Sequence, residues 1–540
     1  MHKLEIKLKQ HTPLIHFQHD QEGFTLRASE VKPKLDKFVI QQAFHNNFDE
    51  CKEYLVGYNP DPQKKENSIM ALRGKWNTGF KALNYKISIE SNSKIHNVEL
   101  LFEPNQNGKF KTYYEEITIR NGEEKSVHNP FPFLISDMGG KDSIDELFNM
   151  CMYKNTTLTI CAFNIELINT ISQNISRFFA LHNFGQRQTK GFGSFTVEYL
   201  KIDDQQEYTI KDWNDYKKSY DNGTWVLCFD LNKSDNDFRR QLMLFSVIDF
   251  YWRCLKSGIN YTKRLIKDDT VKEIYKERYL KAYLWTYLNI TKGSYTWEKR
   301  RLKNEFHLEA ESPQRNYKDN PNSAVFARGM MGCPVNYEYR VPTGILNNRG
   351  KEICDTYTIG IENYVQNPID DNDRRDIIER IASPIIFKPY IEDTKVYVAI
   401  LFDEALISKI KEIPDRKRYF KFSIGEDSTS IPIEPESIDY PELITGFNRF
   451  LWSDTDYINS LWGKLEKDNK GRKNWHPYVT VKKDGDVVSR MCCGVSITFK
   501  FIPRNFQWNN ILLPASLENE KDLNNEWSKH YVHIKRIKKQ

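Results

Sequence analysis

The sequence lacks the features that mark membrane proteins, disulfide-rich secreted proteins and zinc proteins. No apolar stretch approaches the ~18 residues that a membrane helix needs, and the most apolar one, 242–252, is interrupted by Asp249. The start, Met1–Glu5, has no signal-peptide core. Nine cysteines are scattered without a Cys-x-x-Cys pair, which argues against a disulfide framework or a structural zinc site. We therefore expect a cytoplasmic protein with reduced cysteines and no membrane contact.

The common cofactor and nucleophile motifs are also missing. There is no Gly-x-Gly-x-x-Gly, no Walker lysine loop, no His-Glu-x-x-His and no Gly-x-Ser-x-Gly, so we expect no cofactor and no metal. The charge is nearly balanced, because 79 Lys and Arg face 73 Asp and Glu, a net charge of +6. A nucleic-acid partner therefore has to be indicated by clusters of cations rather than by the total charge.

The 540 residues are too many for one hydrophobic core and suggest several domains. In the first 200 residues, hydrophobic periodicity predicts alternating strands and helices. The predicted elements are strand 3–9, a helix with Ser29 as its N-cap, strands 83–90, 97–102 and 157–163, helix 165–183 and strand 194–200. This order is close to the strand–helix–strand–strand–helix–strand plan of ferredoxin-like folds, with insertions at 57–81 and in the loop-rich region 104–150.

The remainder of the chain is less regular. Helices are predicted at 238–256 and 268–290, and strands at 383–390, 395–402 and 494–501. We expect an α+β protein that is divided into an N-terminal domain at 1–205, a largely helical segment at 206–325 and a second α+β domain at 326–540.

Three stretches mix glycine, cations and aromatic residues, and we read them as loops: 71–81, 184–195 and 327–333. Glycine permits positive φ and the close approach of another body. Arginine and lysine favour an anionic body, and the ring of Phe192 offers a face to a base or sugar. With the helix start at Ser29, the stretches indicate a surface that grips a phosphate backbone. The simpler alternative is that they are solvated turns.

The motifs resemble those of a known family. The glycine-rich stretch 185–195 resembles the loop of the RAMP superfamily, the RNA-binding subunits of CRISPR effector complexes, and Thr12–Leu14 with Leu26–Lys32 resembles the family's first strand end and helix start. In the second half, Gly332–Pro334 resembles a Phe-Gly-x-Pro element and Arg380–Lys388 an Arg-x-x-Ser-Pro strand. The combination is most similar to subunit one of the type III-B (Cmr) effector complex.

This resemblance implies two ferredoxin-like (RRM-like, βαββαβ) RAMP domains with helical and loop insertions. It also implies a non-catalytic subunit that binds guide RNA (crRNA) in antiviral defence, with target RNA as a second candidate ligand and the other subunits of the complex as partners. A guide varies in sequence, so its holder is expected to contact phosphate and sugar. The candidate RNA-binding residues are Arg27, Ser29, Lys32, Lys34, Arg73, Lys75, Trp76, Arg187, Lys190, Phe192, Arg328, Arg380 and Lys388.

Two other functions stay open on the sequence. The first is a metal-independent ribonuclease that processes guide precursors, with a histidine near the first strand (His11, His16 or His19, and His16 above all) as general base. The second is a protein-only scaffold. The acidic run 370–373 offers Mg²⁺ ligands, but it lies in a polar segment that needs no ion.

Overall fold

The computed structural model of the chain contains two compact units. The described residues are 1–15, 26–104, 110–120, 123–130, 133, 148–203, 205–231, 237–267, 270–280, 282–292, 296–308, 324–333, 336–346, 352–366, 374–376, 382–411, 417–433, 438–453, 466–467, 473–474, 480–483, 486–489 and 533–536. Unit 1 consists of Met1–Phe245, Phe387–Leu401 and Ile534–Gln540, and unit 2 of Ser246–Ile386 and Phe402–His533. Both units combine helices with antiparallel strands, which confirms the predicted α+β class.

Unit 1 is built on a sheet with the strand order β4-β3-β2-β5-β1-β6-β7, in which neighbours are antiparallel. The strands are β1 (His2–Gln10), β2 (Lys86–Pro104), β3 (Phe110–Arg120), β4 (Glu123–Pro130), β5 (Phe148–Ala162), β6 (Phe195–Ile202) and β7 (Gln205–Thr209). In β1, every second residue, Leu4, Ile6 and Leu8, is fully buried, as the alternation predicts for a strand with one covered face.

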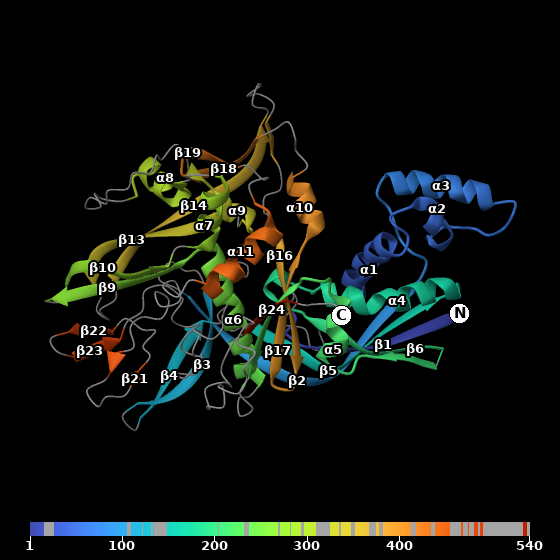
Figure 1. Ribbon diagram of the computed structural model, residues 1–540, viewed down its shortest axis with the longest axis horizontal. Helices are drawn as coiled ribbons and strands as arrows, with labels where there is room; N and C mark the ends of the chain where they lie inside the picture. Colours follow the sequence, from blue (N-terminus) through green and yellow to red (C-terminus); the bar gives the residue numbers. More distant parts are fainter. Residues whose placement is uncertain are drawn as a thin grey trace. The chain divides into compact units, whose positions relative to one another are not determined.

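Two helices cover one side of these strands (Figure 1). They are α1 (Ala28–Gln42) and α4 (Ile165–Leu181), and they pack together through Phe38 and Phe178, whose ring centroids lie 5.6 Å apart. α4 begins where the Asn164 side chain accepts the backbone N–H of Glu166 at 2.8 Å, a normal N-cap. The elements β1, α1, β2, β5, α4 and β6 follow the predicted order, but the strands predicted separately at 83–90 and 97–102 form the single strand β2. The β3–β4 hairpin is inserted in the region predicted to be loop-rich.

The insertion between α1 and β2 is largely helical: of the predicted loop 71–81, residues 71–77 belong to a helix and only 78–81 lie outside it. The insertion contains α2 (Phe48–Cys51), the 3-10 turn η1 (Lys52–Tyr54) and α3 (Lys65–Asn77). The prediction was wrong because Gly74 was taken as a loop signal. One glycine inside a helix costs only ~1 kcal/mol relative to alanine, and the packing of the buried Leu72 outweighs it.

A second sheet of unit 1 has the order β16-β17-β8-β24. Its strands are β8 (Trp225–Asp230), β16 (Ile385–Glu392), β17 (Lys395–Phe402) and β24 (His533–Arg536), so the predicted strands at 383–390 and 395–402 are confirmed. The short helix α5 (Trp213–Tyr216) packs on it, because Trp213 stacks on Tyr397 at 4.3 Å and Tyr216 on Tyr390 at 4.6 Å. Segments far apart in the sequence thus share this part of unit 1.

Unit 2 contains most of α6 (Asp237–Lys256), which confirms the helix predicted at 238–256. The helix predicted at 268–290 is wrong in its first half: 270–280 is a strand and only the second half is helical. The segment has β-branched residues, and its pairing with a neighbouring strand decides its conformation.

Among the described residues, no helix has the length and hydropathy to cross a bilayer.

The remaining elements of unit 2 are helices and strands, and the strands form small sheets that are antiparallel except for the parallel pair of the two-residue strands at 296–297 and 324–325 (Figure 1). They are β9 (Ile259–Lys267), β10 (Thr270–Leu280), α7 (Tyr283–Lys292), β11 (Thr296–Trp297), α8 (Glu298–Glu305), β12 (Ala324–Val325), α9 (Ala327–Met330), β13 (Asn336–Leu346), β14 (Glu352–Gln366), β15 (Arg374–Asp376), α10 (Glu404–Lys411), β18 (Lys417–Ile424), β19 (Asp427–Ile433), α11 (Tyr440–Ser453), β20 (Glu466–Lys467), β21 (Lys473–Asn474), β22 (Thr480–Lys483) and β23 (Asp486–Ser489). Phe326 packs edge-on against Phe420 and Phe422 in its core. The strand predicted at 494–501 lies outside the described residues.

Candidate nucleic-acid interface

The glycine-rich stretch is the loop that the sequence predicts, between α4 and β6. Its glycines have positive φ: +75° at Gly185, +94° at Gly191 and +66° at Gly193. Arg187 also adopts a left-handed conformation, with φ at +54°, and precedes the 3-10 turn η2 (Gln188–Lys190). Such a φ is uncommon for a residue with a side chain, so the loop holds the Arg187 side chain in a direction that ordinary backbone would not give.

The glycines approach the chain's own backbone. A β-carbon at Gly193 would overlap the Phe184 carbonyl oxygen, and one at Gly185 would lie 2.6 Å from the Ile15 carbonyl oxygen. The Gly193 N–H donates to the Pro13 carbonyl at 2.8 Å. The sequence predicts that these glycines admit another body. Here Gly185 admits the segment that follows β1, and Gly193 admits both that segment and the Phe184 carbonyl of its own loop.

Side chains fix the loop as well. The Thr12 hydroxyl donates to the Gly191 carbonyl at 2.7 Å and accepts the Ser194 N–H at 2.9 Å. The buried Asn183 amide donates to the Gln188 carbonyl at 2.7 Å. The loop is therefore a rigid platform rather than a mobile hinge, and Arg187 and Lys190 are presented from fixed backbone.

Arg187 and Lys190 are half-buried residues of this platform, and their Nε and Nζ atoms, respectively, are covered from solvent. The Lys190 Nζ lies 5.8 Å from the ring centroid of Phe133. Phe192, in contrast, is fully buried and stacks on Phe245 with the ring centroids 3.9 Å apart and the planes at 14°. The expected stacking face of Phe192 is thus covered by another ring, and we correct this prediction: Phe192 anchors the loop and offers no face to a base.

The start of α1 meets the loop. The N-cap is Arg27, with φ −98° and ψ 135°, and Ser29 is an exposed residue inside the first turn, so the prediction of Ser29 as N-cap is wrong. Glu30 in the first turn accepts the Gly185 N–H at 2.7 Å. Its carboxylate thus occupies the position where the helix dipole favours an anion, so a phosphate at this helix end would compete with Glu30.

Lys32 and Lys34 are two residues apart on α1, and their side chains contact different parts of unit 1. The Lys32 ammonium contacts the buried Asp36 carboxylate at 2.9 Å and donates to the Leu83 carbonyl at 2.9 Å, and it lies 3.8 Å from the Tyr85 ring centroid. Burial raises the pKa of Asp36, and the charge of Lys32 opposes that shift. Lys32 therefore serves the packing of α1 against the insertion.

Lys34 connects α1 to the loop. Its ammonium contacts Glu30 at 3.1 Å and donates to the Gln188 amide oxygen at 3.0 Å and to the Asn183 carbonyl at 3.3 Å. It also lies 4.9 Å from the ring centroid of Phe184. Because each of these partners belongs to the loop or to the first turn of α1, Lys34 positions the platform, and most of its hydrogen-bonding capacity is used inside the molecule.

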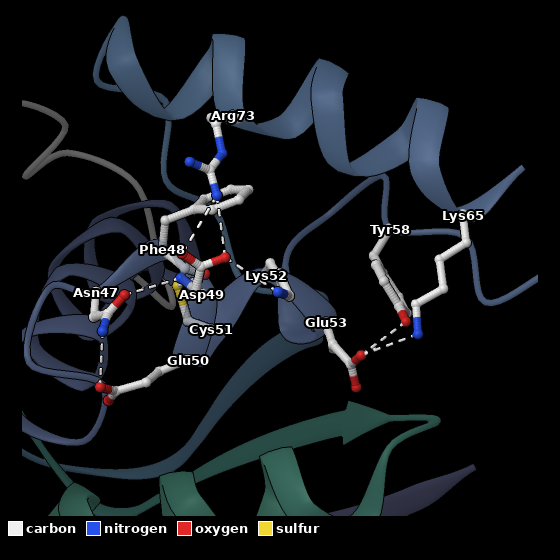
Figure 2. Close-up of polar contacts among 10 residues, drawn as sticks. All are labelled: Asn47, Phe48, Asp49, Glu50, Cys51, Lys52, Glu53, Tyr58, Lys65 and Arg73. Carbon is white, nitrogen blue, oxygen red and sulfur yellow. Dashed lines mark hydrogen bonds and ion pairs between the residues drawn. The ribbon is translucent and has the colours of Figure 1, made fainter.

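The predicted cations of the insertion lie on α3. Figure 2 shows Arg73 over the Phe48 ring, with its guanidinium carbon 4.9 Å from the ring centroid, and its ion pair with Asp49 at 3.1 Å. Lys75 is exposed, and Trp76 is half-buried with its ring 5.6 Å from that of Phe48. Arg73 and Lys75 are therefore accessible, whereas part of the Trp76 ring is covered.

Two of the three predicted C-terminal residues are held by internal partners. Arg328, in unit 2, forms an ion pair with the buried Glu298. Lys388, in unit 1, is fully buried and donates to the carbonyls of His182 at 2.8 Å and Phe195 at 3.0 Å. Burial lowers the pKa of Lys388 well below its usual value. The Lys388 side chain is therefore not accessible at the surface. Arg380 lies outside the described residues.

The proposed catalytic histidines are placed only in part. His11 is buried, its Nδ1 accepts the Ile391 N–H at 2.9 Å, and its Nε2 lies 2.8 Å from the Thr196 hydroxyl. Burial lowers the pKa of His11 well below 6.5, so the ring is neutral and sequestered from a substrate. His16, His19 and the acidic run 370–373 lie outside the described residues. In the part of the chain that the structure describes, no His, Cys, Asp and Glu residues form a group suited to a metal ion.

The structure thus brings the first turn of α1 and the glycine-rich loop together, whereas the α3 cation Arg73 contacts Asp49 and Phe48 of α2. Sequence reasoning missed Glu30 and Asn183, which join these two elements. It also missed Phe80, a 54% exposed ring directly after α3. The signal for Phe80 is Gly79, a typical residue after a helix C-terminus.

Comparison with known protein families shows two domain matches in this chain. Residues 1–259 match the Cmr1 N-terminal domain, and residues 279–460 match the Cmr1 C-terminal domain. Among curated proteins, no sequence matches.

The solved structures with some likeness include a chain of "Cryo-EM structure of the Type III-B Cmr-beta bound to cognate target RNA and AMPPnP, state 2, in the presence of ssDNA", with 10% identity, a TM-score of 0.30 and coverage of 83% of this chain and 98% of that one. A chain of "Cryo-EM structure of the Type III-B Cmr-beta bound to cognate target RNA" has 13% identity, a TM-score of 0.25 and coverage of 74% and 94%. Since both TM-scores are below 0.5, the assignment depends on the two domain matches. They confirm the identification as subunit one of a type III-B CRISPR effector complex, and the chain belongs to the Cmr1 family.

Proposed function

We propose that this chain is the non-catalytic subunit that holds guide RNA in its effector complex, and that it grips the sugar–phosphate backbone without reading the bases. The observation that carries this proposal is the rigid junction of α1 and the glycine-rich loop, from which Arg187 and Lys190 are presented. A fixed pair of cations suits a ligand whose charge pattern is constant and whose sequence varies. The proposal leaves sequence specificity to base pairing.

We also infer the two ferredoxin-like RAMP domains that the family resemblance implies. The antiparallel order β2-β5-β1-β6 with α1 and α4 supports this plan for unit 1. For the C-terminal half it depends on the resemblance alone. The division at residues 205 and 325, the cytoplasmic location and target RNA as a second ligand belong to the same proposal.

Binding of guide RNA by the purified chain tests this function. A double variant, Arg187→Ala with Lys190→Ala, should weaken binding about tenfold, if each charge contact with a phosphate contributes ~1 kcal/mol. The loss should be the same for two guides of unrelated sequence. Lys218→Ala removes a cation that is 73% exposed elsewhere in unit 1, and it serves as the control. Unchanged affinity of the double variant would remove the loop from the interface.

The ribonuclease alternative is tested with precursor RNA in the presence of EDTA. The only described histidine of the candidate set, His11, is buried and bonded, so we expect binding without cleavage. Cleavage that disappears in a His16→Ala variant would establish the nuclease instead. Absence of any RNA affinity at low salt would favour a protein-only scaffold.

A further inference from the structure

An exposed aromatic ring, Phe80, directly follows α3 and is held in a fixed position. Its N–H donates to the Lys75 carbonyl at 3.0 Å, and the Gly79 N–H donates to the Trp76 carbonyl at 3.0 Å. With φ at +90° on Gly79, these two bonds form a Schellman motif, the common end of an α-helix. The backbone of Phe80 is thereby fixed, although its side chain is 54% exposed.

Lysines flank this ring. The Lys75 ammonium lies 5.9 Å from the ring centroid of Phe80. The Lys81 ammonium lies 4.2 Å from the ring centroid of Trp76 and donates to the Asn46 side chain at 2.8 Å. One positive charge, that of Lys75, therefore stands beside the exposed Phe80 ring, and a second, that of Lys81, stands over the neighbouring Trp76 ring.

Asp49, a carboxylate on α2, is engaged by two other cations. Figure 2 shows Asp49 between Arg73 and Lys52, with contacts of 3.1 Å to each. Hydrogen bonding from Lys52, and then the charge of Arg73, lowers the pKa of Asp49. Asp49 therefore does not neutralise the positive charges of Lys75 and Lys81, and these charges are available to attract an anionic ligand.

We propose that Phe80 is a stacking platform for one unpaired RNA base, with Lys75 and Lys81 contacting the phosphates on either side of it. An exposed ring with a cation beside it matches the two chemical parts of single-stranded RNA, a flat base and a charged backbone. Because the backbone of Phe80 is already fixed, stacking requires ordering of its side chain alone. This proposal depends on the proposed function, which it extends from the glycine-rich loop to the end of α3.

Exposure of a hydrophobic side chain alone does not form a stacking site for an RNA base. Phe163 is 85% exposed and Met70 on α3 is 73% exposed. Phe163 stands at the start of α4, where the next charged residue is Glu166, and among the described residues no cation lies over its ring. Phe163→Ala therefore removes an exposed ring without the charge pattern, and it is the matched control.

Fluorescence anisotropy with labelled oligoadenylate and oligouridylate tests the site in the full chain. Phe80→Ala should weaken oligoadenylate binding about tenfold, with an unchanged salt slope because no charge is lost. Phe80→Trp should retain the affinity, and Phe163→Ala should leave it unchanged. Lys75→Ala should reduce the magnitude of the salt slope by about 0.7, the value for one phosphate contact on a single strand.

The outcomes separate this inference from the function on which it depends. Loss of affinity in Phe80→Ala with rescue by Phe80→Trp supports the platform. If Phe80→Ala binds like the unmodified chain while the Arg187 and Lys190 double variant is weakened, the platform is refuted and the proposed function stands. If no variant changes the affinity, both fail. Equal losses in Phe80→Ala and Phe163→Ala would refute a specific site.

Discussion

Gly193→Ala should disrupt the glycine-rich loop much more than an alanine at a glycine with open surroundings. The added methyl group would overlap the Phe184 carbonyl oxygen and lie 2.9 Å from the Leu14 side chain, at a residue with φ of +66°. The left-handed conformation costs ~1–2 kcal/mol for alanine. Relief of the overlap breaks the bonds from Phe184 N–H to the Gly193 carbonyl (3.0 Å) and from Gly193 N–H to the Pro13 carbonyl (2.8 Å), at ~1 kcal/mol each.

The expected cost is thus ~3–4 kcal/mol in the free energy of opening the loop. Gly79→Ala is the matched control, because Gly79 has φ of +90° but nothing within 4 Å of the added carbon, and only the ~1–2 kcal/mol of backbone strain applies. Hydrogen exchange of peptides covering 184–195 and 74–84, followed by mass spectrometry, measures local opening in each region. Equal protection losses in the two variants would refute the conclusion that Gly193 serves the close approach of the chain's own backbone.

Three further predictions follow from the packing. Lys32→Met leaves the buried Asp36 carboxylate without its cation, and thermal unfolding should show a loss of ~3 kcal/mol, whereas an affinity loss at normal stability would assign Lys32 to RNA. Gly74→Ala, inside α3 with nothing within 4 Å, should stabilise by ~0.5–1 kcal/mol, and destabilisation in the same assay would contradict the helical assignment. His11 has a lowered pKa in the fold, so the unfolded state binds the extra proton. Stability should fall by up to ~1.4 kcal/mol per pH unit as pH decreases below about 6.5, and His11→Gln should flatten urea-unfolding profiles between pH 6.5 and about 5.5.

Periodicity was sufficient for elements with one buried face. β1 alternates through Leu4, Ile6 and Leu8, and α4 has a continuous apolar stripe, so both elements could be predicted from local sequence. The element order of the first 200 residues followed from them. The segment 270–280 could not be predicted in this way, because its strand conformation depends on pairing with β9, a partner that no short window contains.

The candidate site was only partly predictable for a related reason. The composition of 184–195 indicates glycine at positive φ and cations on a loop, and the structure agrees. The composition cannot indicate which side chains are buried. Phe192 is covered by Phe245, and the buried Lys388 donates to two backbone carbonyls. The sequence shows which residue types are present, but whether a side chain is buried depends on segments that lie far away in the sequence. The cations at Lys32 and Lys34 likewise have internal carboxylate partners four residues away, a spacing that favours ion pairs on a helix.

The central claim is that the loop grips a phosphate backbone, and the salt dependence of guide-RNA affinity tests it most directly. For a single strand, the logarithm of the affinity falls with the logarithm of salt concentration by ~0.7 per phosphate contact. The account predicts that the double variant Arg187→Ala with Lys190→Ala lowers the magnitude of this slope by about 1.4 for every guide sequence. An unchanged slope, or a change that depends on the guide sequence, would contradict it.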